Sequence, residues 1–303
     1  LARAWRAASW SFEHLASLPG ADVQVPLSMS LEESSSATRK RSISLAQYCK
    51  SLASGSGHPG YVKQCELLDM FPFLQEDIGE LPFPDSHVFV TPYAWLGAPG
   101  SHTGLHQDDE DNVLVVLKGR KRVRLAHPSA APWLYVNDKY DSGTVCADAS
   151  LLFPDPARHP LLAKVPLVLD VEMGPGDALL FPADWWHEAV SDSASISLNF
   201  FASTWTDMLV RGLPRCAGIA AHELGLYRPG HCVCHSAKTA VADGDAESVH
   251  KSQLPLEVWW LLAGGAVMAS VAAVWAYTPA RQAAKRALEQ LATLARGEGA
   301  AVR

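Results

Sequence analysis

Basic residues and cysteines are both scarce in this sequence, and each shortage excludes a class of protein. The chain has 25 Lys and Arg against 32 Asp and Glu, a net charge of −7. A general nucleic-acid binder needs a basic surface to displace counterions from phosphates, so we expect no nucleic-acid partner. Six cysteines are scattered over 303 residues without a CxxC pair, so the core should not depend on disulfides. An apolar fraction of 48%, with 20 Pro and 21 Gly, fits a globular, turn-rich protein.

The N-terminal part of the chain carries helical signals. Residues 1–30 predict a helix followed by a strand, and residues 32–43 are polar and predict a surface loop. Ser44 and Gln47 form a weak capping box, which predicts a short helix from Leu45 to Leu52.

The centre of the chain has the pattern of a β-structure. From Val88 to Phe201, short apolar runs alternate with turn signals, and no helical period of useful length is present. Several short strands at such spacing indicate a β-sandwich or barrel. Residues 203–230 are expected to be helical again. The predicted fold is therefore mainly β with flanking helices.

A charge-free segment near the C-terminus predicts a membrane span. Val258–Tyr277 holds only uncharged residues, with aromatic residues at both ends. As a helix it would span about 30 Å, the thickness of the hydrocarbon core. We therefore expect a C-terminal hydrophobic helix and a single-pass membrane location, with the compartment undefined. The Lys and Arg residues after this segment predict a cytoplasmic tail. A buried hairpin or a dimer helix is the alternative.

The sequence thus divides into four expected units. They are a large domain over 1–230, a polar linker with a Cys/His cluster over 231–256, a transmembrane helix over 257–278 and an amphipathic basic tail over 279–303. The tail is expected to lie on the membrane interface or to pair with a partner, and a homodimer is one option. The cluster HCVCH, His231 to His235, leaves open zinc binding, a disulfide or acylated cysteine, and no special role, because Cys-x-Cys is not the usual zinc spacing.

Two residues in the centre of the chain have the spacing of metal ligands. His106 and Asp108 share one side of a strand, because residues i and i+2 point the same way. His187, 81 residues later at the end of another apolar strand, is the candidate third ligand. Two histidines and one carboxylate on one face leave three positions open, as in non-haem Fe(II) oxygenases. Such a triplet also arises by chance on surfaces. The next acids in the chain, Asp109 to Asp111, are expected to form a solvated turn.

A lysine on the following strand is expected to point inward. Lys121 shares one strand face with Val123 and Leu125, so all three face the core if the two apolar residues do. A buried ammonium needs an anion to offset its desolvation, and an anionic co-substrate is one answer. The alternatives are that the arginine face of this strand is the inner one, or that Lys121 pairs with an internal Asp177.

Much of the sequence resembles a known family. Four stretches, YVKQCELLDMFPFLQEDI, WLGAPGSHTGLHQDDEDNVLVVLKGRKRVRLAHP, LYVNDKYDSG and MGPGDALLFPADWWHEAVSDSASISLNFF, are similar to a Jumonji-C (JmjC) domain of the cupin type and cover roughly residues 20–205. They resemble the hydroxylase-like branch, which includes the asparaginyl hydroxylase that inhibits hypoxia-inducible factor. The resemblance implies a double-stranded β-helix, or jelly roll, that binds Fe(II) between its sheets.

The resemblance also implies roles for single residues. The implied iron ligands are His106, Asp108 and His187. The implied ligands of the far carboxylate of 2-oxoglutarate are Thr103 and Lys121, with Asn112, Asn199 and Tyr93 as further polar residues beside the co-substrate. Thr103 lies at an odd offset from His106, so a bulge or turn at Gly104 is needed for both to face inward.

The function that the resemblance implies is an Fe(II)- and 2-oxoglutarate-dependent dioxygenase that uses O2 and hydroxylates a protein side chain. One alternative is an N-methyl-lysine demethylase. The other is a catalytically silent JmjC module that serves as a scaffold at a membrane.

Overall fold

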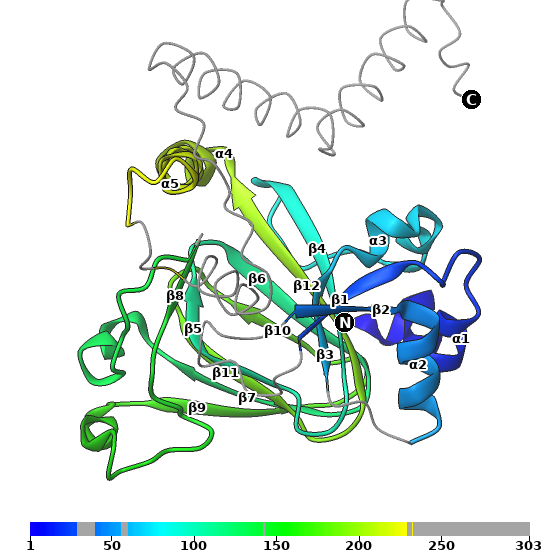
Figure 1. Cartoon of the computed structure of the whole chain (residues 1–303), viewed down its shortest axis with the longest axis horizontal. Helices are drawn as coiled ribbons and strands as arrows, with labels where there is room; N and C mark the ends of the chain where they lie inside the picture. The colour runs from blue at the N-terminus through cyan, green and yellow to red at the C-terminus, as the bar shows by residue number, and fades with distance from the viewer. Residues whose placement is uncertain (29–39, 56–59, 142, 229–231, 233–303) are drawn as a thin grey trace, which may run out of the picture.

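The computed structural model describes residues 1–28, 40–55, 60–141, 143–228 and 232. Within these ranges the chain forms two antiparallel β-sheets that face each other, with helices at one side and at one end (Figure 1). The larger sheet has the strand order β10-β6-β12-β4-β3-β1-β2, and the smaller sheet has the order β8-β5-β11-β7-β9. The predicted mainly β fold is confirmed.

The strands of the larger sheet are β1 (Gln24–Ser28), β2 (Lys40–Ser44), β3 (Tyr61–Cys65), β4 (His87–Gly97), β6 (Asp111–Lys118), β10 (Ala178–Phe181) and β12 (Ser195–Thr204). Those of the smaller sheet are β5 (His102–Asp108), β7 (Lys121–Ala126), β8 (Thr144–Cys146), β9 (Val168–Met173) and β11 (Trp186–Ser191). From β4 to β7 and from β9 to β12, consecutive strands alternate between the sheets, which is the connectivity of the predicted jelly roll.

Short helices cover the outer face of the larger sheet. They are η1 (Ala2–Ala4), η2 (Arg6–Ser9), α1 (Phe12–Ala16), α2 (Leu45–Ala53), α3 (Leu67–Met70) and η3 (Pro72–Asp77). The predicted helix at Leu45 is confirmed, and the Ser44 side chain accepts a hydrogen bond from the amide of Gln47 as a cap. Trp10, Leu15 and many other apolar side chains of these helices form one buried cluster with the outward residues of the sheet.

A second apolar cluster fills the space between the sheets. Leu114 and Val116 of β6 meet Val123 and Leu125 of β7 there, and Phe181 of β10 closes the cluster. Alternate residues of a strand point to the same face. The strand faces that form this apolar cluster therefore also carry the polar residues that lie between the sheets. The smaller sheet is covered on its outside by η4 (Pro128–Trp133) and η5 (Pro160–Lys164).

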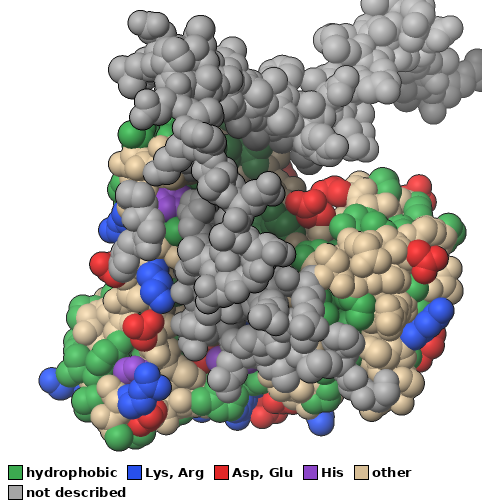
Figure 2. Space-filling model, in the orientation of Figure 1, with side chains coloured by type: hydrophobic (Ala, Val, Ile, Leu, Met, Phe, Trp, Pro, Cys, Tyr) green, Lys and Arg blue, Asp and Glu red, His purple; other side chains and the backbone are tan. Residues whose placement is uncertain are grey.

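The last described helices lie at the end of the sheets where β5 and β6 meet (Figure 1). They are α4 (Trp205–Asp207), a π-helical turn η6 (Met208–Gly212) and α5 (Leu213–Glu223). Thr204 and Asp207 form a capping box that starts this helical run. On the face drawn in Figure 2, Lys and Arg side chains are interspersed with Asp and Glu.

The expected membrane location is corrected. The longest helix in the described ranges is α5, with 11 residues, which is about 17 Å at 1.5 Å per residue against about 30 Å for a bilayer core. Among the described residues no helix is both long and apolar enough to cross a membrane, and this overturns the predicted single-pass location. The segment Val258–Tyr277, the polar linker and the basic tail lie outside the described residues.

Candidate metal centre

Three side chains that can bind a metal converge between the sheets. His187 of β11 lies directly opposite His106 of β5 in the antiparallel ladder. Asp108 Oδ2 lies 3.7 Å from His106 Nε2 and 3.5 Å from His187 Nε2. One ligand atom from each residue lies within 4.8 Å of the others. The three predicted ligands are therefore together, and they form the one such cluster of three among the residues that the structure describes.

Backbone carbonyls set the orientation of both imidazoles. His106 Nδ1 lies 2.7 Å from the carbonyl oxygen of Gly104, and His187 Nδ1 lies 2.9 Å from that of Trp185. A carbonyl only accepts, so each Nδ1 carries the proton and each Nε2 presents a lone pair toward Asp108. Metal-binding histidines are held in this way by a hydrogen bond to the other ring nitrogen. Two neutral imidazoles and one carboxylate on one face fit a divalent transition metal such as Fe(II).

Burial keeps His187 neutral. Desolvation, with a smaller contribution from nearby His106, lowers the pKa of His187 to about 4. The ring of Phe181 stacks on that of His187 at an interplanar angle of 7° and a centroid distance of 4.7 Å, and the imidazole is thus covered on one face. A neutral imidazole is the form that binds a metal, so His187 needs no deprotonation step near neutral pH.

A β-bulge brings Thr103 to the same face as His106. His187 pairs with His106 but Ala189 pairs with Thr103, so two steps on β11 correspond to three on β5. The bulge predicted at Gly104 is confirmed, and the carbonyl of Gly104 is the one that accepts from His106.

Thr144 contacts the carboxylate ligand and was not predicted. Its Oγ1 donates to Asp108 Oδ1 at 3.0 Å, and the two residues are partners in the β5–β8 ladder. This hydrogen bond leaves Asp108 Oδ2 as the oxygen that faces the histidines. Strand β8 has three residues and lies in a turn-rich stretch, so the sequence carries no periodic signal for it.

Lys121 points inward, as predicted. Its side chain is buried with only 3% exposed, and Val123 and Leu125 are buried beside it, whereas the arginines of β7 lie on the other face. The ammonium donates to the hydroxyl of Tyr61 at 3.2 Å. Burial lowers the pKa of Lys121 to about 8. The alternative partner, Asp177, pairs with Arg3 instead.

Two buried donors near Tyr61 have no hydrogen-bond partner among the described residues. The ring of Trp95 lies 5.8 Å from that of Tyr61, and its indole N–H is buried and unpaired. The hydroxyl of Ser197, which is the ladder partner of Trp95, is also buried and unpaired. Buried donors without partners are costly, so a polar ligand beside Lys121 is the expected occupant. Neither residue was predicted from the sequence, and neither was Tyr61.

The two predicted asparagines contact each other. Asn199 Nδ2 donates to Asn112 Oδ1 at 3.0 Å, and both side chains are buried. Tyr93 is the ladder partner of Asn199, so it lies on the same inner face. Its ring packs edge-on against Phe201, and burial raises the pKa of its hydroxyl. The tyrosine that contacts Lys121 is Tyr61, and the role of Tyr93 beside the co-substrate stays a prediction.

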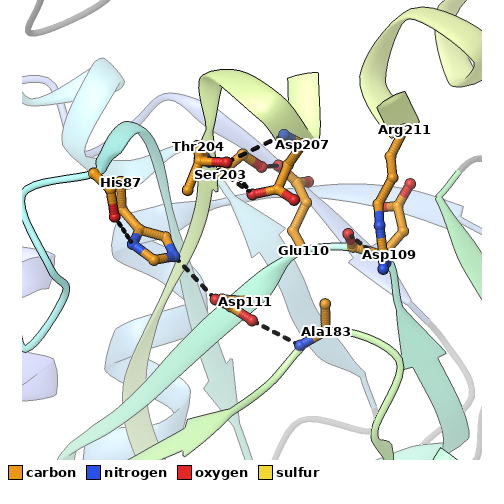
Figure 3. A network of polar contacts seen from close by, with 10 residues as sticks. His87, Asp109, Glu110, Asp111, Ala183, Ser203, Thr204, Asp207 and Arg211 are labelled. Atoms are coloured by element: carbon orange, nitrogen blue, oxygen red, sulfur yellow. Dashed lines mark hydrogen bonds and ion pairs between the residues drawn. The ribbon is translucent and has the colours of Figure 1, made fainter. Parts of the chain in front are cut away.

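The acids after Asp108 do not form a solvated turn, and that prediction is wrong. Each of them is partly buried and paired (Figure 3). Asp111 accepts from the amide of Ala183 at 2.8 Å and lies 2.9 Å from His87 Nε2. Glu110 accepts from Ser203 at 2.7 Å, and Asp109 accepts from Arg215 at 2.7 Å. The partners lie far along the chain, so the local sequence of the turn could not identify them.

Most of the predicted Cys/His cluster lies outside the described residues. Cys232 is described, and it is buried and forms a backbone bridge with Tyr140. No disulfide joins two of the described cysteines.

Comparison with known proteins agrees with this geometry. The family model of the cupin-like domain matches residues 15–207. The chain is 34% identical over 161 residues to Jumonji C domain-containing protein 5 of Drosophila melanogaster, covering 51% of this chain and 39% of that protein. It is 30% identical over 136 residues to tRNA wybutosine-synthesizing protein 5 of Homo sapiens, covering 45% of this chain and 41% of that protein. It is 26% identical over 204 residues to lysine-specific demethylase 8 of Xenopus tropicalis, covering 64% of this chain and 44% of that protein.

The matches span about two fifths of the length of these relatives. The family model covers well over half of this chain and includes both sheets and all three candidate ligands. The chain therefore belongs to the cupin-like domain family, and within it to the JmjC proteins.

Proposed function

We propose that this protein is an Fe(II)- and 2-oxoglutarate-dependent dioxygenase that hydroxylates a protein side chain. The observation that carries the proposal is the convergence of two oriented imidazoles and one carboxylate, with an inward lysine farther along the same face of the smaller sheet. The overall reaction joins 2-oxoglutarate, O2 and a substrate C–H bond, and releases succinate, CO2 and the C–OH product. Iron bound by the three ligands supplies the activation of O2.

The three ligands hold the metal from one side and leave the opposite side for reactants. His106, Asp108 and His187 would hold the metal, and the 2-oxo acid end of the co-substrate and O2 would bind on its open side. Phe181 covers one face of the His187 ring and shields that imidazole from water.

Lys121 is the proposed partner of the far carboxylate. It pairs with Ser191 in the ladder to β11, four residues from His187 on the same strand face. Four residues of strand cover roughly 13 Å. The co-substrate and the Lys121 side chain together would bridge this distance. Tyr61, Trp95 and Ser197 would add hydroxyl or indole donors around this carboxylate. The donors of Trp95 and Ser197, which are buried and unpaired among the described residues, support the proposal. Thr103 stays a proposed further donor.

A cavity of about 550 Å³ lies beside the chain segments that follow Asp108 and precede Thr144, and it is the proposed entry for the substrate. It is lined by residues that include Asp109, Tyr140, Gly143, Arg211, Arg215 and Tyr227. Asp109 follows the ligand Asp108 in the chain, and Gly143 precedes Thr144. A cavity of this size accepts a single side chain more readily than a folded surface.

Removal of an N-methyl group from lysine is a second candidate function. Lysine-specific demethylase 8 of Xenopus tropicalis is 26% identical to this chain over 204 residues. The chemistry at the metal is the same for both candidates, because a hydroxylated N-methyl group breaks down to formaldehyde and the free amine. The two candidates therefore differ only in the released product.

The test is an assay of wild-type protein with Fe(II), 2-oxoglutarate and O2. Succinate release that His106→Ala abolishes is the expected result, and equal turnover by the variant would refute an enzymatic role. Mass spectrometry of candidate protein substrates separates the two functions. A gain of one oxygen atom supports hydroxylation, whereas loss of a methyl group with formaldehyde release supports demethylation.

A further inference from the structure

The segments that carry Asp108 and His187 are joined by a backbone contact. The amide of Asp184 donates to the carbonyl oxygen of Asp108 at 2.7 Å. Asp184 has a φ of 67°, in the left-handed region, which aspartate adopts more readily than most other residues with a side chain. The groups that contact Asp184 help to hold the loop before His187 in this conformation.

Arg211 makes that contact with both arms of its guanidinium. Nη1 and Nη2 donate to the two carboxylate oxygens of Asp184 at 3.1 and 2.9 Å. Nη1 also donates to the carbonyl oxygen of Asp109 at 3.3 Å. Figure 3 shows Arg211 reaching from the helical run toward Asp109. A single side chain thus contacts the residue after one candidate ligand and the loop that leads to another. A two-armed pair fixes direction as well as distance.

Arg215 reinforces the same arrangement one helical turn later. It donates to Asp109 Oδ1 at 2.7 Å and to Glu110 Oε2 at 3.1 Å. Residues four apart share one helix face, so Arg211 and Arg215 both approach the end of β5. The two arginines contact the neighbours of Asp108, whereas the carboxylate of Asp108 is contacted by Thr144. Asp108 is held in place without an arginine competing for its charge.

A π-helical turn presents Arg211 to these groups. Met208–Gly212 forms this turn between α4 and α5. A π-turn has a wider hydrogen-bonded loop than an α-turn, and one inserted residue rotates the rest of the helix by about 100° relative to a regular helix. The direction in which the Arg211 and Arg215 side chains point therefore depends on this π-turn. Such turns recur at functional sites. This turn lies beyond residues 15–207, which the family model matches.

We propose that Arg211 is a positioning residue for the metal centre, which fixes the spacing of Asp108 and His187 by bridging Asp109 and Asp184. The inference rests on the proposed function in that a divalent metal binds the three ligands. A lysine would keep the positive charge at this position but lacks the planar fork that engages two oxygens of Asp184 and a carbonyl together. The geometry, rather than the charge alone, is the feature under test.

The test measures Co²⁺ binding by Arg211→Lys without co-substrate or substrate. Titration followed by visible absorption is expected to give an affinity about tenfold weaker than that of the wild type, with altered Co²⁺ absorption bands. Arg6→Lys is the matched control, because Arg6 pairs with Asp77 at 3.0 Å on the outer helices. The control is expected to leave affinity and bands unchanged.

A second variant separates positioning from a general loss of stability. Asp184→Asn is expected to weaken Co²⁺ binding as well, and the double variant should bind no more weakly than Arg211→Lys alone, because both changes break the pair between Arg211 and Asp184. Wild-type affinity and bands in Arg211→Lys would overturn the positioning role, whether or not its melting temperature falls. Absence of Co²⁺ binding by the wild type would instead overturn the proposed metal function.

Discussion

His187 and His106 lie opposite each other in the β5–β11 ladder, with ring centroids 4.1 Å apart and the rings tilted by 54°. Hydrogen bonds from both Nδ1 atoms to backbone carbonyls leave both Nε2 atoms free to face Asp108. Backbone groups close to the two histidines in the chain thus hold both rings in an orientation in which they could bind one metal ion. This relationship makes the ligand role directly testable.

His187→Ala should remove metal binding and turnover together. Loss of a ligand leaves two donors, so divalent metal affinity is expected to fall at least about 100-fold, and succinate release should fall with it. Metal titration and a succinate assay on the same preparations check the result. His14→Ala is the control, because His14 is exposed on α1. Tight metal binding by His187→Ala would contradict the assigned ligand set.

The inward direction of Lys121 follows from local alternation along a strand, and the bulge at Gly104 follows from the same alternation once the family resemblance places Thr103 inward with His106. Val123 and Leu125 fix which face of β7 is buried, and the odd offset of Thr103 from His106 requires one extra residue in β5. Such features involve residues within a few positions of each other. They could be predicted because the period of a strand is a property of the sequence itself.

The partners of these residues could not be predicted in the same way. Tyr61 reaches Lys121 from β3, and Thr144 reaches Asp108 from a three-residue strand. Arg215 meets Asp109 from 106 residues away. Each contact depends on how separate strands and helices pack, and no periodicity encodes that. The resemblance implied Tyr93 beside the co-substrate, and it gave no indication that packing would bring Tyr61 to the lysine.

Lys121→Met should weaken co-substrate binding while it stabilises the ligand-free protein. The affinity for 2-oxoglutarate is expected to fall about 10- to 100-fold, because hydrogen bonds to charged groups contribute about 1.5–3 kcal/mol. The lowered pKa of Lys121, about 8, implies a burial cost of roughly 3 kcal/mol, which the apolar side chain avoids. Calorimetric titration and thermal unfolding check both effects. Unchanged 2-oxoglutarate affinity would refute the assigned role.

The pKa of Lys121 also predicts how co-substrate affinity changes with pH. Below pH 8 the ammonium is charged, which is the form that would pair with the carboxylate of 2-oxoglutarate. Above pH 8 the free protein must first take up a proton, so the apparent Kd is expected to rise about tenfold per pH unit. Titrations between pH 7 and pH 9, with Mn²⁺ in place of iron, measure the slope. Lys121→Met should show no such slope, and a flat wild-type profile would contradict the assignment.

The same pKa sets the sign of a stability effect. Burial lowers the pKa of Lys121 to about 8 from its ordinary 10.5, so between these values the unfolded chain binds more protons than the folded one. The contribution of this group to stability therefore rises with pH across that window, because the cost of burying the charge is relieved. The stability advantage of Lys121→Met should shrink as the pH rises from 8 toward 10.5. Denaturant unfolding at several pH values measures it, and an advantage independent of pH would contradict the buried-ammonium explanation.

Trp95→Phe should separate a co-substrate donor from a core aromatic. The indole N–H of Trp95 is buried without a partner among the described residues, so its removal takes no hydrogen bond from the ligand-free protein. If that N–H donates to the carboxylate held by Lys121, the variant loses about 1 kcal/mol of binding, a rise in the Kd for 2-oxoglutarate of about fivefold. Thermal unfolding without ligand should change little, because Phe keeps most of the contact with the Tyr61 ring. Trp205→Phe is the control, since Trp205 is 52% exposed on α4. Equal 2-oxoglutarate affinity in Trp95→Phe and the wild type would place the carboxylate away from this donor.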